Sequence, residues 1–491
     1  MTFRDFLPPG ILSLVFLVLQ AFAAGLVGYG IFADELYYLA CARHLAAGYV
    51  DHPPLSIWIL WALPVTGKSL LALRLAPALA GACTVFLTGL MARRLGGSPG
   101  AAFLAAACAA AMPVLQVVTG FYSMNAFELL IFVTLLLVLL EIQLSDRVQL
   151  WPWVGLLVGL GVMNKHTMGL LSLVFVLPIV LNKWRMTLKS GYFYLAGLVV
   201  AIVIAPNVYW IIEHDFISFE FYRNATIEKN IATSPVKGLI DQILATNPAT
   251  LPVWAVGLYA SFRRNELRPF GLAFIGILAV FLVSESSRPD RIMSIYPIMF
   301  AVGAVSLSDL IRRILSVVVP LAGLFFAPIS MPLLSPEPLG KFVRMLGVVP
   351  QIEKGKQTML PQWFADRFGW EDVAKIVDGV IETLPPGERE TAVVIAPWYG
   401  PAGAIELYSK TAPTVVSGHN SYYLWGLPLR EMKTFIVIGY PIEALRPRFK
   451  SVEPAGFYTR PYSTEENVPV VICRDPVAPL REQWRELRRF N

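Results

Sequence analysis

The chain has 491 residues, of which 56% are hydrophobic and 15% charged, and its mean hydropathy is +0.60. A soluble domain of this length could not cover so much apolar surface, so most of the chain is expected to lie in lipid. The net charge of +6 is modest, and no nucleic-acid partner is expected. The four cysteines have no paired spacing, so neither a disulfide framework nor a zinc site can be read from them.

Apolar segments of spanning or near-spanning length predict about eleven transmembrane helices. In chain order they are 11–31, 70–91, 101–118, 127–142, 151–163, 168–181, 191–212, 238–260, 270–283, 292–307 and 314–334. The first segment resembles a signal peptide, with Ala21-Phe22-Ala23 as a cleavage triplet. It is long enough to span, however, and nothing polar precedes Asp34, so we expect an uncleaved first helix.

The positions of Lys and Arg predict the orientation of these helices. With a cytoplasmic amino terminus and a real turn at 164–167, the main basic clusters all fall in short cytoplasmic loops. These clusters are Arg93-Arg94, Arg147, Lys183/Arg185/Lys189, Arg263-Arg264/Arg268 and Arg312-Arg313. A single broken helix over 151–181 would move the last three outside, so two helices are favoured. The cations left on the outer side need another explanation; they are Arg43, Lys165, Arg223, Lys229, Arg288 and Arg291.

This topology brings five polar groups to the outer membrane surface. They are Asp34-Glu35, Asp51-His52, 121–125, Lys165-His166 and 288–291. Two adjacent carboxylates are costly to desolvate, so a protein that keeps them at a membrane surface usually uses one of them. The alternative is that Asp34 only caps a helix expected over 36–47. Convergence of the other groups favours a catalytic site at the outer interface.

From about Glu353 the composition becomes hydrophilic. Strands are expected at 391–396, 414–416, 434–439 and 468–473, and helices at 366–380, 402–410 and 480–490. We therefore predict a membrane domain over 1–340 and an extracytoplasmic α/β domain over 353–491. The stretch 417–423 is polar and aromatic enough for carbohydrate contact, although turn chemistry explains it equally well.

Three motifs of the first external loop carry a resemblance to a known family. They are Asp34-Glu35-Leu36-Tyr37-Tyr38, Arg43-His44-Leu45-Ala46 and the stretch 48–55, Gly-Tyr-Val-Asp-His-Pro-Pro-Leu. The chain resembles the bacterial members of glycosyltransferase family 39, similar to protein O-mannosyltransferases and lipid A aminoarabinose transferases. Weaker matches, such as 123–128 and 160–166, extend the resemblance over nearly the whole chain.

The resemblance implies a polytopic α-helical membrane protein with a GT-C-like fold, about eleven helices and interfacial helices in the first external loop. It also implies an inverting glycosyltransferase in the bacterial cytoplasmic membrane. Such an enzyme moves a sugar from a polyprenyl-phosphate carrier to a hydroxyl of a lipid, glycan or protein acceptor at the outer face. Neither the sugar nor the acceptor can be read from the sequence.

By the same resemblance, Asp34 is the expected general base, and Glu35 supports it or orients the acceptor. Lys165, Arg288 and Arg291 are expected to hold the donor phosphate, with His52 as a second choice. The expected acceptor or sugar pocket comprises Tyr37, Asp51, Tyr122, Asn125 and His166. No cofactor or metal is expected, although paired carboxylates could hold a divalent cation.

Structural alternatives stand beside these assignments. Lys165 and His166 could merely end two short helices, and Arg288 could pair with Asp290 on the surface. A secondary transporter or lipid-linked sugar flippase is the alternative function. Transporters, however, place ionisable residues near the membrane midplane and often contain internal repeats, whereas here the acids lie at one interface and no repeat is visible. A non-catalytic scaffold would leave the paired acids and converging cations without a purpose.

Overall fold

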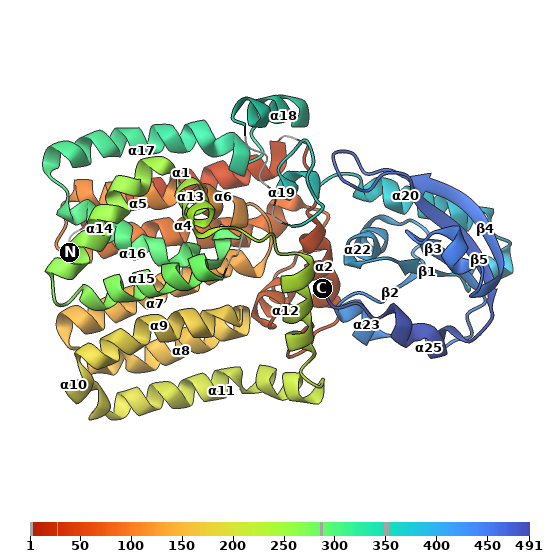
Figure 1. The fold of residues 1–491 in the computed structure, drawn as a ribbon, viewed down its shortest axis with the longest axis horizontal. Coiled ribbons are helices and arrows are strands. Elements are labelled where there is room, and N and C mark those ends of the chain that lie inside the picture. Colours follow the sequence, from red (N-terminus) through yellow and green to blue (C-terminus); the bar gives the residue numbers. More distant parts are fainter. Residues whose placement is uncertain (1–2, 27, 285–287, 348–350, 352) are drawn as a thin grey trace.

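In the computed structural model, a helical bundle carries a five-stranded sheet at one end (Figure 1). The structure describes residues 3–26, 28–284, 288–347, 351 and 353–491. The bundle helices are α1 (Phe3–Leu26), α4 (Leu70–Arg94), α5 (Pro99–Ala110), α6 (Pro113–Val118), α7 (Met124–Ser145), α8 (Trp151–Asn164), α9 (Thr167–Asn182), α11 (Gly191–Glu213), α13 (Pro235–Ala245), α14 (Leu251–Arg263), α15 (Arg268–Val283), α16 (Tyr296–Ser306) and α17 (Asp309–Ser330).

The chain is a multi-pass membrane protein. In the described part of the chain, five helices are long and apolar enough to cross a bilayer: α1, α4, α7, α11 and α17. Of the shorter apolar helices, α5 packs against α1, α4 and α17, α9 packs against α7, and α15 packs against α9. The turn expected at 164–167 is present, since α8 ends at Asn164 and α9 begins at Thr167.

Two of the expected spanning segments are divided, and proline is the reason. The segment 101–118 breaks into α5 and α6 at Pro113, and the segment 238–260 breaks into α13 and α14 near Pro248. Proline has no N–H to donate to the preceding turn, and it disfavours helical backbone in the residue before it. Accordingly Asn247 has a φ of 72°, and its side chain caps the short 3₁₀ turn that follows. A single helix over 238–260 was therefore the wrong prediction.

Short helices cover the end of the bundle that faces the sheet. The first external loop forms α2 (Ala33–Arg43) and α3 (Leu55–Ala62). Thus α2 begins and ends earlier than the predicted 36–47. The helix α12 (Ile217–Glu228), which was not predicted, lies near α2 at this end, whereas α10 (Trp184–Leu188), within one of the basic clusters, lies at the opposite end (Figure 1).

The sheet has the strand order β2-β1-β3-β5-β4. Its strands are β1 (Val393–Ala396), β2 (Thr414–Ser417), β3 (Thr434–Ile438), β4 (Phe449–Tyr458) and β5 (Val468–Pro476). β1 pairs in parallel with β2 and β3, and β5 runs antiparallel to β3 and β4. The sequence did not predict β4, because Pro454 and Gly456 weaken the strand pattern; the ladder shifts register between them, and proline is tolerated at a sheet edge.

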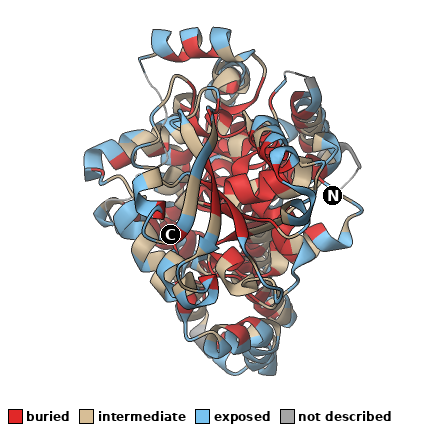
Figure 2. Cartoon of the chain, turned by 90° about the vertical axis from the view of Figure 1, so that its right-hand side faces the viewer, coloured by how far each residue is buried: buried red, intermediate tan, exposed pale blue. Residues whose placement is uncertain are grey.

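Helix α2 joins the bundle to the sheet region. It packs beside α22 (Tyr399–Tyr408), which follows β1, and its buried residues share one apolar cluster with Trp370 of α20 (Trp370–Thr383). A Cβ added at Gly403 of α22 would lie 2.9 Å from Leu36 Cβ, so glycine permits this close approach. Viewed from the sheet end, buried residues occupy the centre and exposed ones the rim (Figure 2).

Candidate active site

Asp34 lies in the first turn of α2, where its side chain is partly buried against α22. Its Oδ1 accepts a hydrogen bond of 2.8 Å from the hydroxyl of Tyr399, the first residue of α22. Burial raises the pKa of Asp34, and the Tyr399 hydrogen bond opposes part of that rise. The capping position of α2 is Phe32, whose N–H is bound by Glu35. The alternative that Asp34 only caps the helix is therefore wrong.

Glu35 is fully buried, and its carboxylate is held by four hydrogen bonds. Arg74 of α4 donates to Oε1 over 3.0 Å and to Oε2 over 2.7 Å. The backbone N–H groups of Tyr122 and Phe32 each donate over 2.8 Å. Although burial alone would raise the pKa of Glu35, Arg74 outweighs it and lowers the pKa. These bonds anchor the first turn of α2, the turn that also carries Asp34. Any catalytic role of Glu35 stays a prediction.

Two lysines lie within electrostatic reach of Asp34, and we call them the lysine pair. Lys229 Nζ, just after α12, is 3.8 Å from Glu353 Oε1, and Lys356 Nζ is 3.4 Å from Glu353 Oε2. Burial would raise the pKa of Glu353, but the lysine pair lowers it to about 2. Both ammonium groups also oppose the rise in the pKa of Asp34. Glu353 itself adds to the rise, so Asp34 lies in the field of a Lys–Glu–Lys cluster drawn from two distant parts of the chain.

Lys165 sits in the break between α8 and α9 and is tied to α7. Its Nζ donates to Glu128 Oε2 over 2.6 Å and to Asn125 Oδ1 over 2.9 Å. Glu128 is fully buried, whereas the Lys165 side chain is 12% exposed. The alternative that Lys165 merely marks a helix end does not account for this pair, because the salt bridge connects the break between α8 and α9 to α7. Phosphate binding by Lys165 stays a prediction.

Arg288 pairs with Asp290, as the surface-pair alternative predicted. Its Nε and Nη2 lie 3.3 and 3.2 Å from the two carboxylate oxygens of Asp290. Burial would raise the pKa of Asp290, but Arg288 and Lys165 outweigh it and lower the pKa to about 2. Asp290 raises the pKa of Arg288 most, and Asp34 contributes as well. Arg288, Arg291 and Lys165 thus share one electrostatic neighbourhood that extends to Asp34, while their phosphate role stays a prediction.

His52 is enclosed by tyrosine rings and is only 2% exposed. Its ring stacks on Tyr38 at 4.9 Å and lies 5.0 Å from Tyr49, and its Nδ1 is 2.9 Å from the Pro53 carbonyl oxygen. Its Nε2 is 4.0 Å from Asp51 Oδ1. The enclosing tyrosines leave little of this ring accessible to a phosphate, and phosphate binding by His52 stays a prediction.

The other predicted pocket residues take part in internal contacts. The Tyr37 hydroxyl is 2.8 Å from both Asp51 Oδ1 and Ser421 Oγ, which joins the first external loop to the sheet region. The Tyr122 hydroxyl donates to the Ser56 carbonyl oxygen over 2.7 Å. His166 makes two contacts through its ring nitrogens. Its Nδ1 is 2.6 Å from the Tyr222 hydroxyl, and its Nε2 is 2.9 Å from Asn207 Oδ1. Burial lowers the pKa of His166, which favours the neutral ring.

The sequence did not single out four groups around the paired acids: Tyr399, Lys356 and Glu353 near Asp34, and Arg74 on Glu35. A signal was available for Tyr399, because it starts the helix after β1, a strand with parallel neighbours, and ligand sites favour that position. Lys229 had a signal too, as one of the cations on the outer side. Lys356 and Glu353 carry no local signal, since only the folding of the chain between α18 (Pro336–Met345) and α20 brings them to Asp34.

A metal site is not evident in the part of the chain that the structure describes. There, no group of three or more His, Cys, Asp or Glu side chains is arranged to hold a metal ion. Glu35 is engaged by Arg74 and two backbone N–H groups, so the paired acids of the sequence do not form a joint cation site. Metal dependence stays open to experiment.

Comparison with known proteins supports the resemblance seen in the sequence. Residues 51–210 match the family model described as dolichyl-phosphate-mannose-protein mannosyltransferase. Two crystal structures of ArnT from Cupriavidus metallidurans, one apo and one bound to undecaprenyl phosphate, superpose with TM-scores of 0.61 and 0.63 at 15% and 16% identity. Each covers 94% of this chain and 97% of its own. The chain has the ArnT fold. The expected resemblance to glycosyltransferase family 39 is thereby confirmed.

A curated relative extends the similarity at the level of sequence. Undecaprenyl phosphate-alpha-4-amino-4-deoxy-L-arabinose arabinosyl transferase 2 of Pseudomonas fluorescens is 27% identical over 286 residues. The match covers 54% of this chain and 48% of the relative, so it spans about half of that protein. The ArnT-like fold accounts for both parts of the architecture, the polytopic helical bundle and the mixed sheet that follows it.

Proposed function

We propose that this protein is an inverting glycosyltransferase that moves a sugar from a polyprenyl-phosphate carrier to an acceptor hydroxyl at the outer face of the bacterial cytoplasmic membrane. The observation that carries the proposal is a partly buried carboxylate, Asp34, whose pKa is raised and which lies close to several cations at one end of a membrane bundle. The two relatives whose printed names include undecaprenyl phosphate support a lipid-phosphate donor.

Asp34 is the proposed general base. The acceptor hydroxyl attacks the anomeric carbon, its proton passes to the Asp34 carboxylate, and the bond from that carbon to the phosphate oxygen breaks. The bonding electrons leave with the polyprenyl phosphate, and the anomeric configuration inverts. Burial raises the pKa of Asp34, which makes its carboxylate a stronger base than an exposed aspartate. The Tyr399 hydrogen bond orients the carboxylate and keeps it ionised.

The departing lipid phosphate needs cations rather than a proton donor. We assign this role to the lysine pair, together with Arg288 and Arg291 and with Lys165 behind them. Lys229, Lys356 and Arg288 each interact electrostatically with Asp34, so charge developing on a leaving group beside this carboxylate falls within their field. In the free protein these cations are neutralised by Glu353 and Asp290, and a bound phosphate competes with those carboxylates.

The experiment is transfer of radiolabelled sugar by purified protein in liposomes, from a panel of polyprenyl-phosphate sugars to a membrane acceptor fraction. The proposal expects transfer that depends on the donor and releases polyprenyl phosphate. A second arm adds EDTA, and we expect the rate to persist because no step requires a divalent cation. Movement of the intact lipid-linked sugar across the bilayer without cleavage would favour the flippase alternative instead.

A further inference from the structure

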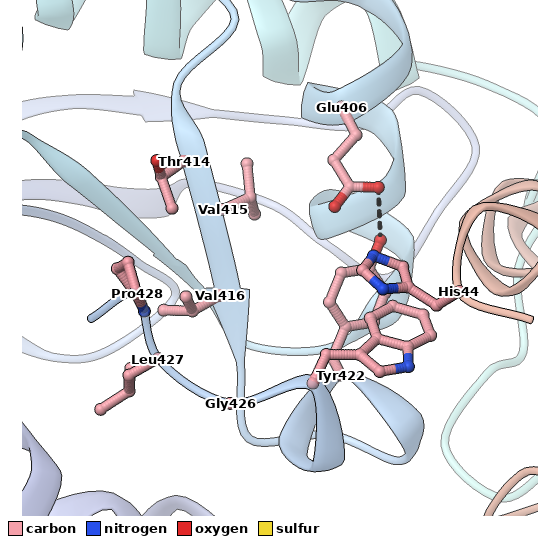
Figure 3. A pocket seen from close by; sticks show the side chains of 10 residues that line it. His44, Glu406, Thr414, Val415, Val416, Tyr422, Gly426, Leu427 and Pro428 are labelled. Carbon is pink, nitrogen blue, oxygen red and sulfur yellow. Dashed lines mark hydrogen bonds between the residues drawn. The ribbon is translucent and has the colours of Figure 1, made fainter. Parts of the chain in front are cut away.

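A cavity of about 200 Å³ lies where the end of α2 meets the edge of the sheet (Figure 3). His44 forms one wall, and the edge strand β2 forms the other, from Thr414 to Val416. Glu406 of α22, Tyr422 and Trp425 complete its polar and aromatic lining. The volume is below the roughly 300–1,000 Å³ of pockets that hold drug-sized ligands, so it suits a single ring-sized group.

The lining presents both an aromatic surface and a hydrogen-bond acceptor. The rings of His44 and Trp425 stack at 4.2 Å, and Trp425 lies 4.5 Å from Tyr422. Glu406 Oε2 accepts hydrogen bonds from the Tyr422 hydroxyl over 3.0 Å and from Arg43. Within the described residues no hydrogen bond reaches the other oxygen, Oε1, which is turned away from Tyr422 (Figure 3). A carboxylate oxygen beside aromatic rings is the chemistry that binds the hydroxyls and the apolar face of a sugar ring.

The cavity lies at a fixed distance from Asp34. Helices α2 and α22 run side by side in the same direction, because Asp34 meets Tyr399 at their first turns and Arg43 meets Glu406 near their last. His44, the residue directly after α2, lies ten positions after Asp34, which at about 1.5 Å per residue is about 15 Å along the helix. A donor sugar whose anomeric carbon lies beside Asp34 cannot also fill the cavity.

A row of aromatic rings makes this spacing rigid. Tyr399, which donates a hydrogen bond to Asp34, stacks on Tyr37 at 4.7 Å between ring centroids. Tyr37 is followed by Tyr422 at 6.4 Å, then Trp425 at 4.5 Å and His44 at 4.2 Å. Because these side chains are closely packed, the row fixes the position of the cavity relative to Asp34.

We propose that this cavity binds a sugar ring of the acceptor, about 15 Å from the hydroxyl that is glycosylated. The inference rests on the proposed function and narrows it, because it assigns the acceptor to the saccharide-bearing class. Binding at a second point would strengthen acceptor binding equally in the ground state and the transition state, so it would lower the acceptor KM and leave kcat unchanged. The competing occupant is a peptide strand added to the edge strand β2.

The first arm measures binding alone. Saturation-transfer NMR on the full chain in detergent uses glucose, glucosamine, N-acetylglucosamine and galacturonate, with a valine–threonine pentapeptide as the competing probe. We expect at least one sugar to bind the wild type and Glu406→Gln to weaken it about tenfold through loss of a charged acceptor. Arg43→Gln removes the ion pair but keeps the carboxylate, and the exposed Glu443→Gln lies outside the cavity. Neither control should weaken binding.

Three results of this arm would overturn the proposal. The first is that no sugar binds, or that sugar binding is indifferent to Glu406→Gln. The second is that Arg43→Gln weakens binding as much as Glu406→Gln does, which would reduce Glu406 to a contact between the helices. The third is that the pentapeptide, and not a sugar, binds in a manner sensitive to Glu406→Gln.

The second arm uses the transfer reaction with a glycolipid acceptor. We expect Glu406→Gln to raise the KM for the acceptor about tenfold and to leave kcat and the donor KM unchanged. An unchanged acceptor KM would contradict the subsite while leaving the glycosyltransferase function intact. Conversely, sugar binding that is lost in Glu406→Gln would support the subsite even if every donor failed in the transfer assay. Failure of the sugar subsite can therefore be distinguished from failure of the proposed glycosyltransferase function.

Discussion

At the residue scale, the two adjacent acids that mark the first loop have different environments. Burial raises the pKa of Asp34, whereas Arg74 lowers that of Glu35. One carboxylate thus binds a proton more readily than an exposed aspartate, and the other is stabilised as an anion by Arg74. Sequence alone could place the pair at the membrane surface, but it could not separate their roles, because Arg74 lies 39 residues away in α4.

The pH dependence tests the link between Asp34 and Tyr399. The hydrogen bond from Tyr399 lowers the pKa of Asp34, so Tyr399→Phe should raise that pKa further. The base works only when ionised, and the acid limb of the pH–rate profile should therefore move to higher pH, by about one unit for loss of a charged hydrogen bond. The measurement is kcat/KM against pH, with Tyr408→Phe in the same helix as control. An unmoved acid limb would argue against Asp34 as the titrating base.

Stability tests the role of Glu35. Removing one partner of a buried ion pair costs about 3–5 kcal/mol, so Glu35→Gln should unfold at a clearly lower temperature than the wild type in detergent. Since folding lowers the pKa of Glu35, its contribution is complete above the ordinary value of about 4.3 and is lost as pH falls through the folded-state value. A variant that keeps its melting temperature but loses transfer would instead give Glu35 a direct part in the chemistry.

At the element scale, the close contact of α2 and α22 positions the site. Gly403 makes the contact possible, because an added Cβ would lie 2.9 Å from Leu36 Cβ and 3.1 Å from its backbone. Gly403→Ala should push α22 away from α2 and draw Tyr399 from Asp34, lowering kcat by about tenfold to a hundredfold. The control is Gly379→Ala in α20, where an added Cβ meets nothing within 4 Å. Equal activity of both variants would show that the contact does not set the site.

The elements themselves were predictable where the physical signal is local. The distribution of charge separated α8 from α9, and short β-like segments located β1, β2, β3 and β5. The prediction failed for β4, whose Pro454 and Gly456 look like a turn and are accommodated only by its place at the sheet edge. It failed again at Pro248, where a hydropathy average over 238–260 hides the interruption.

The site shows the same division between local and tertiary information. Asp34 and the cations at 165, 288 and 291 were found because they stand out in apolar surroundings. Tyr399 and Lys356 lie more than three hundred residues from Asp34, and they approach it only because the chain after α17 folds back over the bundle. No window along the sequence contains that information.

At the scale of the whole molecule, the proposed topology places the sheet and the site outside the cytoplasm. Lys189 follows α10 at the far end of the bundle, and Glu443 is exposed in the sheet region; both side chains are solvent-accessible. In a variant whose native cysteines are replaced, Glu443→Cys should react with a membrane-impermeant maleimide on intact spheroplasts. Lys189→Cys should react only after permeabilisation. The reverse pattern would place the carboxylate on the cytoplasmic side and contradict the assigned acceptor compartment.

Under the proposed function, the sheet region has a catalytic purpose as well. Tyr399 reaches Asp34 from α22, and the segment carrying Glu353 and Lys356 supplies charge to the same carboxylate. The site is therefore completed by the hydrophilic part of the chain, which the sequence alone could describe only as a separate α/β unit. Neither the helical bundle nor the hydrophilic part of the chain contains all the groups around Asp34 by itself.

The most direct test of the central claim is transfer of labelled sugar from polyprenyl-phosphate donors by the wild type and by Asp34→Asn. The amide keeps the shape of the side chain but cannot accept the acceptor's proton. We predict a loss of about 10²–10⁴-fold in kcat, the usual contribution of a general base, with the melting temperature and the donor KM retained. Transfer at the wild-type rate by a folded Asp34→Asn protein would contradict the account.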